Sequence, residues 1–317
     1  MFSIVNINNW SYLDIHVSGS KEKRWYRDPM NNKLHLFKIP VSLTSSKWKI
    51  KNESTGEMWS EKITSEIGKK LHLDIHDVEV GVIDLNTEII THLGVDPIKV
   101  LDGKVYGALC SSFLSEGLES LIEGADMIMD FDTTYDRDTL KGEVEIYSYD
   151  LLYRVFTAYN CVTELFKMVI FDTLIGNTDR HQDNFGVVRD EVTGILRFSP
   201  LYDNSSCLGR ELPESNMILM LRDNQMFNAY LFGRKSSSLI KWGNVNSFEK
   251  LSSFELLKRI VSSTPAIKKY FNMLDLISDE DIDYIVFNIP NVVMSDVKKT
   301  FVSKVLKTRR DFILKEI

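Results

Sequence analysis

Hydrophobic and polar positions follow two different periods in the two parts of the chain. Up to about residue 114, apolar residues recur at every second position in short segments, which is the spacing of β-strands. Beyond residue 115 they recur at every third or fourth position over longer segments, which indicates amphipathic helices. We therefore predict an α+β protein with two lobes, a β-rich N-lobe at 1–114 and a mainly helical C-lobe at 115–317.

The N-lobe is predicted to be an antiparallel sheet with one helix. The strands are expected at 1–6, 12–18, 24–27, 33–39, 78–83, 88–92 and 104–113. The helix is expected from Glu57 to Leu71, and Ser115-Glu116-Gly117 is expected to be a hinge into the C-lobe. A cleft between two lobes of different class is a favoured place for a ligand.

The C-lobe is predicted to contain several helices and one hairpin. The helices are expected at 117–123, 147–159, 162–175, 248–262, 267–276, 279–288 and 295–317. The hairpin is expected from 185–188 and 194–198. Residues 209–247 are polar without a clear period, and we predict a mobile loop on the substrate side.

The charge balance argues against a nucleic-acid-binding protein. The chain has a net charge of −7, whereas nucleic-acid binders usually carry a basic excess or a basic stripe. Its dense basic cluster belongs to an apolar helix pattern and is interpreted as a solvated helix face; its members are Lys304, Lys307, Arg309 and Arg310.

The cysteines and histidines predict neither a disulfide framework nor a zinc site. Cys110, Cys161 and Cys207 are far apart in the sequence and match no metal-ligand spacing, which favours a reducing compartment. His72 and His76 have the spacing of helical zinc ligands, but apolar residues alternate around them and place them outside a helix. No apolar run is long enough for a membrane span, and no secretory signal is recognisable.

Three oxygen-bearing side chains have the spacing of a phosphoryl-transfer site. Asp179 and Asn184 form D-x-x-x-x-N just after the helix that ends at Gly176, and Asp203 follows the predicted hairpin. In such sites the first Asp orients the attacking hydroxyl, while the Asn and the second Asp bind magnesium. Asp and Asn also collect in turns because they bond to local backbone, so the pair alone is weak. The presence of Asp203 after the hairpin, where the second metal-binding Asp is expected, favours the catalytic interpretation.

Two further N-lobe features fit a nucleotide site. Lys38 lies in an apolar strand and needs a partner for its ammonium. We expect Glu61 of the predicted helix to be that partner, with Glu57 and Glu66 as alternatives. The turn of Gly19, Ser20 and Lys21 could cover phosphates with its backbone, although a simple polar hairpin turn would look the same.

The order of these parts resembles a protein-kinase-like fold. The strings around 19–23, 37–40, 177–186 and 200–205 resemble the HipA family of bacterial Ser/Thr kinases, in the short standalone CtkA-like form that lacks the N-terminal subdomain. The resemblance implies that Lys38 contacts the nucleotide phosphates and that Ser111 to Phe113 hold the adenine through backbone groups. It implies that Asp179 is the catalytic Asp and that Asn184 and Asp203 bind magnesium. The triplet of Asp179, Arg180 and His181 also resembles phosphoinositide kinases, which implies that His181 steadies the phosphoryl group; a histidine packed under the loop is the alternative.

The resemblance also carries expectations about activity and partners. It implies an ATP- and Mg²⁺-dependent kinase of protein Ser/Thr hydroxyls that autophosphorylates at Ser18 or Ser20. A toxin role with an antitoxin or regulatory partner, and a bacterial cytoplasmic location, follow from the same resemblance, with a secreted effector left open. A phosphoinositide or small-molecule kinase is the alternative enzyme, because the acceptor site is not visible in the sequence. A nucleotide-binding scaffold without catalysis is the alternative from another class.

Overall fold

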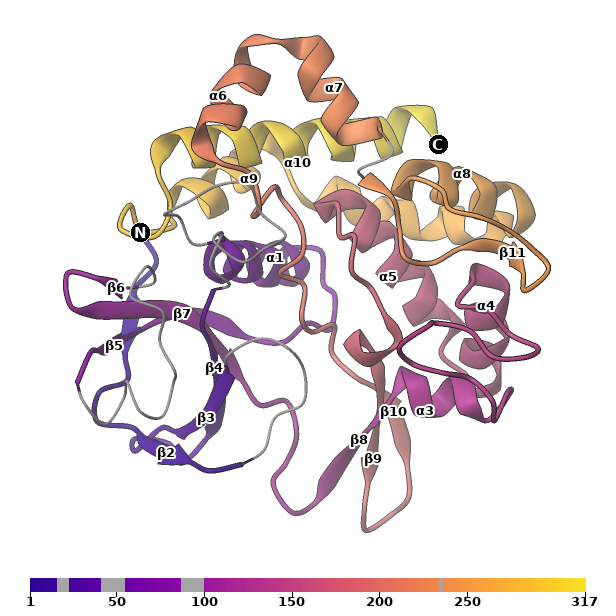
Figure 1. Ribbon diagram of the computed structural model, residues 1–317, viewed down its shortest axis with the longest axis horizontal. Coiled ribbons are helices and arrows are strands. Elements are labelled where there is room, and N and C mark those ends of the chain that lie inside the picture. The colour runs from indigo at the N-terminus through magenta and orange to yellow at the C-terminus, as the bar shows by residue number, and fades with distance from the viewer. Residues whose placement is uncertain (16–22, 41–54, 87–99, 234–235) are drawn as a thin grey trace.

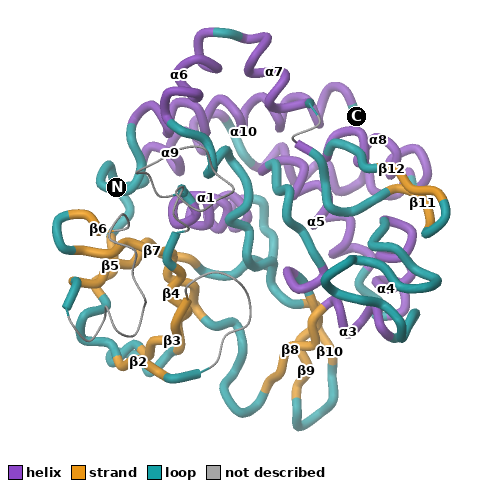
Figure 2. Tube along the Cα trace, in the orientation of Figure 1, coloured by secondary structure: helices purple, strands orange, loops and turns teal. Residues whose placement is uncertain are grey.

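A β-sheet region and a helical region lie side by side in the computed structural model (Figure 1). The structure describes residues 1–15, 23–40, 55–86, 100–233 and 236–317. The sheet belongs to the N-terminal part and most helices belong to the C-terminal part (Figure 2). The predicted fold class is confirmed.

The N-terminal sheet has the strand order β1-β5-β7-β4-β3-β2, with β6 paired to β7. Its strands are β1 (Ile4–Asn6), β2 (Ser11–Leu13), β3 (Lys23–Arg27), β4 (Leu34–Lys38), β5 (Val78–Asp84), β6 (Val100–Leu101) and β7 (Lys104–Ser111). The prediction that residues 1–50 form an antiparallel sheet is wrong for β1, which runs parallel to β5. Strands β2 to β4 and the helix α1 (Glu57–Lys70) lie between these two strands in the sequence and make up the long connection that a parallel pair requires.

Alternation along β7 gives the sheet two buried faces. Val105 and Leu109 belong to a small core with Phe37. Ala108 and Cys110 have the opposite parity and belong to the large core that includes α1. The end of β7 is therefore apolar on both sides, and its α1 side is where Cys110 is buried.

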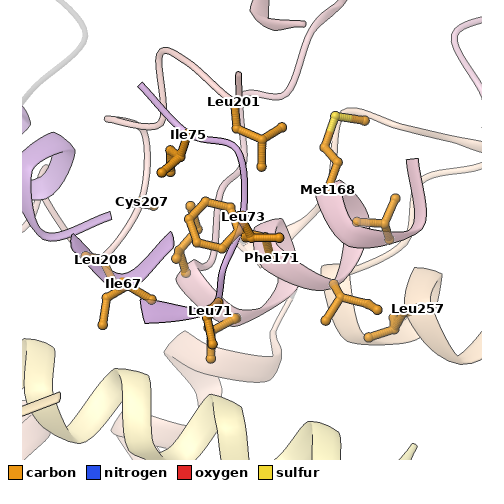
Figure 3. Packing of buried hydrophobic residues seen from close by; sticks show 14 of the residues in the cluster. Ile67, Leu71, Leu73, Ile75, Met168, Phe171, Leu201, Cys207, Leu208 and Leu257 are labelled. Atoms are coloured by element: carbon orange, nitrogen blue, oxygen red, sulfur yellow. The ribbon is translucent and has the colours of Figure 1, made fainter. Parts of the chain in front are cut away.

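The large core joins α1 to the helical region. Figure 3 shows Ile67 of α1 and Leu71, which follows this helix, in one cluster with Phe171 of α5 (Val162–Ile175) and with Leu201 and Leu208 from the segment after the second hairpin strand. Polar contacts fix the same helix to the C-terminal part: Glu57 with Arg210 at 2.6 Å, Ser60 with the Ser205 carbonyl at 2.9 Å, and Lys70 with Asp281 at 2.9 Å. Helix α1 therefore contacts the C-terminal part as well as the N-terminal sheet.

The C-terminal part combines helices with two small sheets. Its helices are α3 (Gly124–Met129), α4 (Tyr149–Ala158), α5, α6 (Glu214–Arg222), α7 (Asn224–Phe232), α8 (Ser253–Ser263), α9 (Asp279–Phe287) and α10 (Asp296–Glu316), with 3₁₀ segments at Gln182–Asn184 and Pro265–Leu276. Its strands are β8 (Glu119–Glu123), β9 (Gly186–Asp190), β10 (Leu196–Phe198), β11 (Trp242–Asn244) and β12 (Ser247–Glu249). The predicted hairpin is confirmed as β9 and β10.

Several predictions for this part are wrong. Residues 117–123 form no helix, because β8 pairs with β9 in a ladder from a distant part of the sequence. The helix predicted to start at 248 starts at Ser253, where Ser252 and Glu255 form a capping box. Residues 209–247 are not a loop: α6 and α7 bury Met217, Phe227 and Leu231 against the rest of the large core.

The basic cluster of α10 is only partly solvated. Arg309 is buried, and its guanidinium donates hydrogen bonds to the carbonyls of Thr173 and Leu231 and to Ser253 Oγ. Thr173 lies in the last turn of α5, whose carbonyls carry the negative end of the helix dipole. The interpretation as a solvated face is therefore wrong for Arg309.

Two predicted segments lie outside the described residues: the strand at 88–92 and most of the phosphate loop. Within the part of the chain that is described, no helix is both long and apolar enough to cross a membrane.

Candidate active site

A cavity of about 610 Å³ lies between the sheet and the helical region. Its polar lining includes most of the described residues that the sequence predicted for the site: Lys38, Ser111, Phe113, Asp179, His181, Asn184 and Asp203. Trp25, Leu36, Leu121 and Tyr202 add apolar and aromatic walls. One cavity thus brings together side chains from β4, β7, the loop after α5 and the loop after β10.

Lys38 connects three of these elements. Its Nζ lies 2.8 Å from Glu61 Oε1 on α1 and 3.2 Å from Asp203 Oδ1 after β10. The prediction of Glu61 as partner is confirmed, and the alternatives Glu57 and Glu66 pair with Arg210 and Lys62 instead. Burial lowers the pKa of Lys38, but the two carboxylates outweigh it and hold this pKa well above its ordinary value. Lys38 is therefore a charged ammonium in the cleft.

Asp203 has a backbone conformation that is uncommon for a side chain with a Cβ. Its φ is 51°, in the left-handed region, which costs of order 1–3 kcal/mol at a non-glycine residue. Such a conformation persists only where its neighbours hold it. Here it turns the carboxylate toward Lys38, and Ser205 Oγ lies 3.3 Å from the same oxygen.

Asp179 and Asn184 are held in one short loop after α5. The helix ends at Gly176, whose φ of 71° is the left-handed cap that glycine favours. Asp179 Oδ2 accepts a hydrogen bond from Ser206 Oγ at 3.2 Å. Asn184 Nδ2 donates to the Asp179 carbonyl at 2.8 Å, which leaves the amide oxygen of Asn184 for a cation.

Arg180, between these residues, is buried and makes hydrogen bonds to several segments of the site. Its guanidinium makes a bidentate pair with Asp172 at 2.9 and 2.7 Å. It also donates to the carbonyls of Asn184 at 2.8 Å and Tyr202 at 3.1 Å and to Asn204 Oδ1 at 2.5 Å. Tyr202 and Asn204 flank Asp203. One side chain therefore fixes both the loop of Asp179 and the strained turn of Asp203 to helix α5.

His181 faces the cavity and is tied to Asp183. Its Nδ1 accepts from the Asp183 N–H at 3.2 Å and lies 3.5 Å from the Asp183 carboxylate. Burial lowers the pKa of His181, but the hydrogen bond to Asp183 and the charges of Asp179, Asp183 and Asp203 raise it more, so it lies above 6.5. A protonated imidazole at this position could stabilise negative charge, whereas the packed histidine of the alternative would be shielded from the cavity.

The end of β7 offers one free backbone donor to a base. The N–H groups of Ser111 and Ser112 already donate to the carbonyls of Asp77 and Leu34, at 2.9 and 2.8 Å. Phe113 follows outside the ladder, with its ring stacked on Tyr202 at 5.3 Å between centroids. Of the backbone donors expected from Ser111 to Phe113, that of Phe113 is therefore the one left for a ligand.

The predicted phosphate loop cannot be placed. Ser18, Gly19, Ser20 and Lys21 lie outside the described residues. Their proposed contacts with phosphate remain predictions.

Behind Lys38, three side chains from three elements meet in the interior. Donor atoms of Glu61, His76 and Cys110 lie within 4.8 Å of one another, and each residue is at most 4% exposed. Burial and the charge of Lys38 lower the pKa of His76 to about 3, so its ring is neutral. Burial and the charge of Glu61 raise the pKa of Cys110 well above its usual value, so its sulfur is a thiol.

Sequence reasoning missed Arg180, His76 and Cys110. Arg180 lies inside the triplet that was singled out, but only its neighbours were assigned roles. The signal for it was available, because an arginine in a loop after an apolar helix needs a carboxylate, and Asp172 is the acid in the last turn of that helix. His76 and Cys110 give no such signal, since their proximity depends on strand pairing.

Comparisons with known proteins agree with this geometry. Residues 125–264 match the HipA-like C-terminal domain family. The serine/threonine-protein kinase CtkA of Helicobacter pylori strain J99 is 22% identical over 303 residues, which cover 94% of this chain and 81% of that protein. The predicted resemblance to HipA-like and CtkA-like kinases is confirmed.

Solved structures show the same fold. The crystal structure of the H. pylori proinflammatory kinase CtkA superposes with a TM-score of 0.74 at 17% identity, covering 98% of this chain and 94% of that one. HipA in the Shewanella oneidensis HipA, HipB and operator DNA complex gives a TM-score of 0.36 at 13% identity, covering 94% of this chain and 67% of that one, which is too low to support a comparison. Together, the family match and the CtkA similarity support a kinase.

Proposed function

We propose that this protein is an ATP- and Mg²⁺-dependent kinase that phosphorylates Ser or Thr hydroxyls of proteins. The observation that carries the proposal is the bridge from Lys38 to both Glu61 and Asp203, in one cavity with Asp179 and Asn184. In kinases, a lysine that is paired with a glutamate of a helix contacts the nucleotide phosphates, and a nearby aspartate holds the metal ion.

The side chains have distinct proposed roles. Asp179 orients the acceptor hydroxyl and takes its proton as the hydroxyl oxygen bonds to the γ-phosphorus and the bond to the ADP oxygen breaks. Lys38 neutralises phosphate oxygens, and His181 stabilises charge on the transferred group. The Phe113 backbone and the ring of Tyr202 bind the base.

The oxygen donors fit magnesium. Asn184 presents its amide oxygen and Asp203 its carboxylate, and carboxylate and carbonyl oxygens are the ligands that Mg²⁺ prefers. Magnesium would neutralise charge on the phosphates. Because Lys38 and Ser205 already contact Asp203 Oδ1, binding of a cation there requires these contacts to lengthen or to shift.

Autophosphorylation is proposed at Ser18 or Ser20. These serines flank Gly19 in the predicted phosphate loop, and a phosphate would add about −1.5 to −2 charges beside ATP. Mass spectrometry after incubation with ATP should find phosphate on one of them, and none in Asp179→Asn. Phosphate found only at other positions would contradict this part of the proposal.

The acceptor and the partners are also part of the proposal. From the match to the HipA-like C-terminal domain family we propose that an antitoxin-like or other regulatory protein binds this kinase and that it acts in the bacterial cytoplasm. Co-purification of the tagged full chain from a bacterial host would identify a stable regulatory partner.

Labelled ATP tests the main proposal. The protein is incubated with labelled ATP, Mg²⁺ and separate panels of proteins and of lipids, with Asp179→Asn as the matched control. Label on Ser or Thr of protein, lost in the control, is the expected result. Label only on lipid or small-molecule hydroxyls would overturn the acceptor class. Nucleotide binding without transfer would overturn catalysis and favour a scaffold.

A further inference from the structure

The buried cluster of Glu61, His76 and Cys110 has the composition of a transition-metal site. It offers a carboxylate oxygen, an imidazole nitrogen and a sulfur, a combination of ligands suited to Zn²⁺. His76 Nε2 lies 3.4 Å from Glu61 Oε1 but makes no hydrogen bond within the described part of the chain. A buried ring nitrogen without a hydrogen bond is costly, and a bound cation would satisfy it.

We propose that Glu61, His76 and Cys110 form a binding site for Zn²⁺ or a similar borderline cation at the back of the cleft, distinct from the proposed magnesium position at Asn184 and Asp203. The three donors approach from α1, from the segment before β5 and from β7. They would draw in by about an ångström to reach bond lengths of about 2.0–2.3 Å. A fourth position remains for water, as in three-ligand zinc sites.

The charges support a dication. One ammonium, on Lys38, faces two carboxylates, those of Glu61 and Asp203, while His76 and Cys110 are neutral. Among these described groups the carboxylates outnumber the ammonium, which favours a cation. Binding of Zn²⁺ forms bonds to Sγ, Nε2 and a Glu61 oxygen and releases the thiol proton to solvent.

The site has an entry path. His76 and Cys110 both line the main cavity, next to Lys38. A cation can therefore reach the donors through the cleft without unfolding of the core. This access distinguishes Cys110 from Cys207, which is buried beside Ser60 and does not line that cavity.

Occupancy would change the pairing of Lys38. Glu61 Oε1 contacts both Lys38, at 2.8 Å, and His76, at 3.4 Å, so a cation bound to this oxygen would weaken its contact with Lys38 and the ammonium would depend more on Asp203, at 3.2 Å. If the proposed kinase function holds, zinc withdraws Lys38 from the phosphates and ties up Asp203. The site would then inhibit phosphate transfer even at excess Mg²⁺.

Cobalt binding tests the site independently of activity. Titration of the full chain with Co²⁺ should give a thiolate-to-cobalt charge-transfer band that Zn²⁺ abolishes at one equivalent. Cys110→Ser should lose the band, whereas the matched control Cys161→Ser, also a buried cysteine, should keep it. His76→Gln should weaken binding at least about tenfold, and it carries the test if Cys110→Ser does not fold. Asp203→Asn should retain the band.

The outcomes separate the site from the proposed function. Absence of a thiolate band in the parent, or a band that survives in Cys110→Ser, would overturn the site. Inhibition of phosphate transfer by Zn²⁺, at least about tenfold weaker in Cys110→Ser than in the parent, would support the link to Lys38. A cobalt band without inhibition would overturn that link. If the protein transfers no phosphate even without zinc, the proposed function fails while the band still decides the site.

Discussion

Replacement of Arg180 by lysine should lower both the free energy of unfolding and the affinity of the proposed magnesium site at Asn184 and Asp203. Lysine can keep a charge beside Asp172, but its single ammonium cannot reproduce the bidentate pair and the bonds to Asn184, Tyr202 and Asn204 together. Hydrogen bonds to charged groups contribute about 1.5–3 kcal/mol each. Because lysine retains some of them, we expect a loss of about 3 kcal/mol in the free energy of unfolding.

The loss should appear in two assays. At about 1.5–2 °C per kcal/mol for a chain of this length, Arg180→Lys should lower the Tm by about 4–6 °C. The turn of Asp203 would no longer be held on both sides, so its strained φ should relax and its carboxylate should leave the cleft. We therefore expect the Mg²⁺ concentration for half-maximal phosphate transfer to rise at least about tenfold, a cost of about 1.4 kcal/mol.

A surface arginine provides the control. Arg154 pairs with Glu145 at 2.6 Å but is 42% exposed, so Arg154→Lys should change stability by less than about 1 kcal/mol and leave the Mg²⁺ requirement unchanged. Asn204→Ala removes a single bond to Arg180 and should show the Mg²⁺ effect with a smaller loss of stability. If Arg180→Lys melted within about 2 °C of the parent with an unchanged Mg²⁺ requirement, the proposed role of Arg180 in holding the Asp179 loop and the Asp203 turn would be refuted.

Three further predictions concern the cavity. Asp179→Asn should fold, melt within a few degrees of the parent and still bind Mg-ATP, yet lose at least about a hundredfold in turnover, because the amide cannot accept the proton; turnover within about threefold would argue against the catalytic role. Asp203→Ala should abolish the Mg²⁺-dependent part of the thermal shift caused by ATP, and a folded variant with an unchanged shift would disprove its metal role. By NMR, His181 should titrate above 6.5, and Asp183→Asn should lower its pKa. Because the folded-state pKa of His181 is raised, protonated His181 stabilises the fold at low pH, and this contribution is lost as the pH rises through that pKa. An unchanged pKa of His181 in Asp183→Asn would contradict its pairing with Asp183.

Local signals in the sequence predicted much of the candidate site. Gly176 and the polar residues after it predict the end of α5, because a left-handed cap favours glycine. Lys38 in an apolar strand requires a carboxylate, and the pattern of α1 selected Glu61 correctly. These predictions depend on residues close in sequence or on a single unmet electrostatic need.

Features that depend on distant pairing were not predictable in this way. Residues 119–123 became β8 because β9 supplies a partner strand, and nothing local indicates that partner. Arg309 looked like one more surface cation of α10, and its burial depends on the end of α5 arriving beside it. Helices α6 and α7 are rich in apolar residues, but each is only nine residues long and polar segments flank the pair, so neither shows a helical period over more than about two turns.

The anchoring of α1 has a consequence for how such a kinase could be switched. In many kinases, activity is controlled by the position of the helix that carries the glutamate. Here that helix shares a core with α5 (Figure 3). Ion pairs of Glu57 with Arg210 and of Lys70 with Asp281 also connect both of its ends to the C-terminal part. An outward swing of α1 would have to break that core. Control of this site by displacement of α1 is therefore disfavoured, and the C-terminal part holds Glu61 in place beside Lys38.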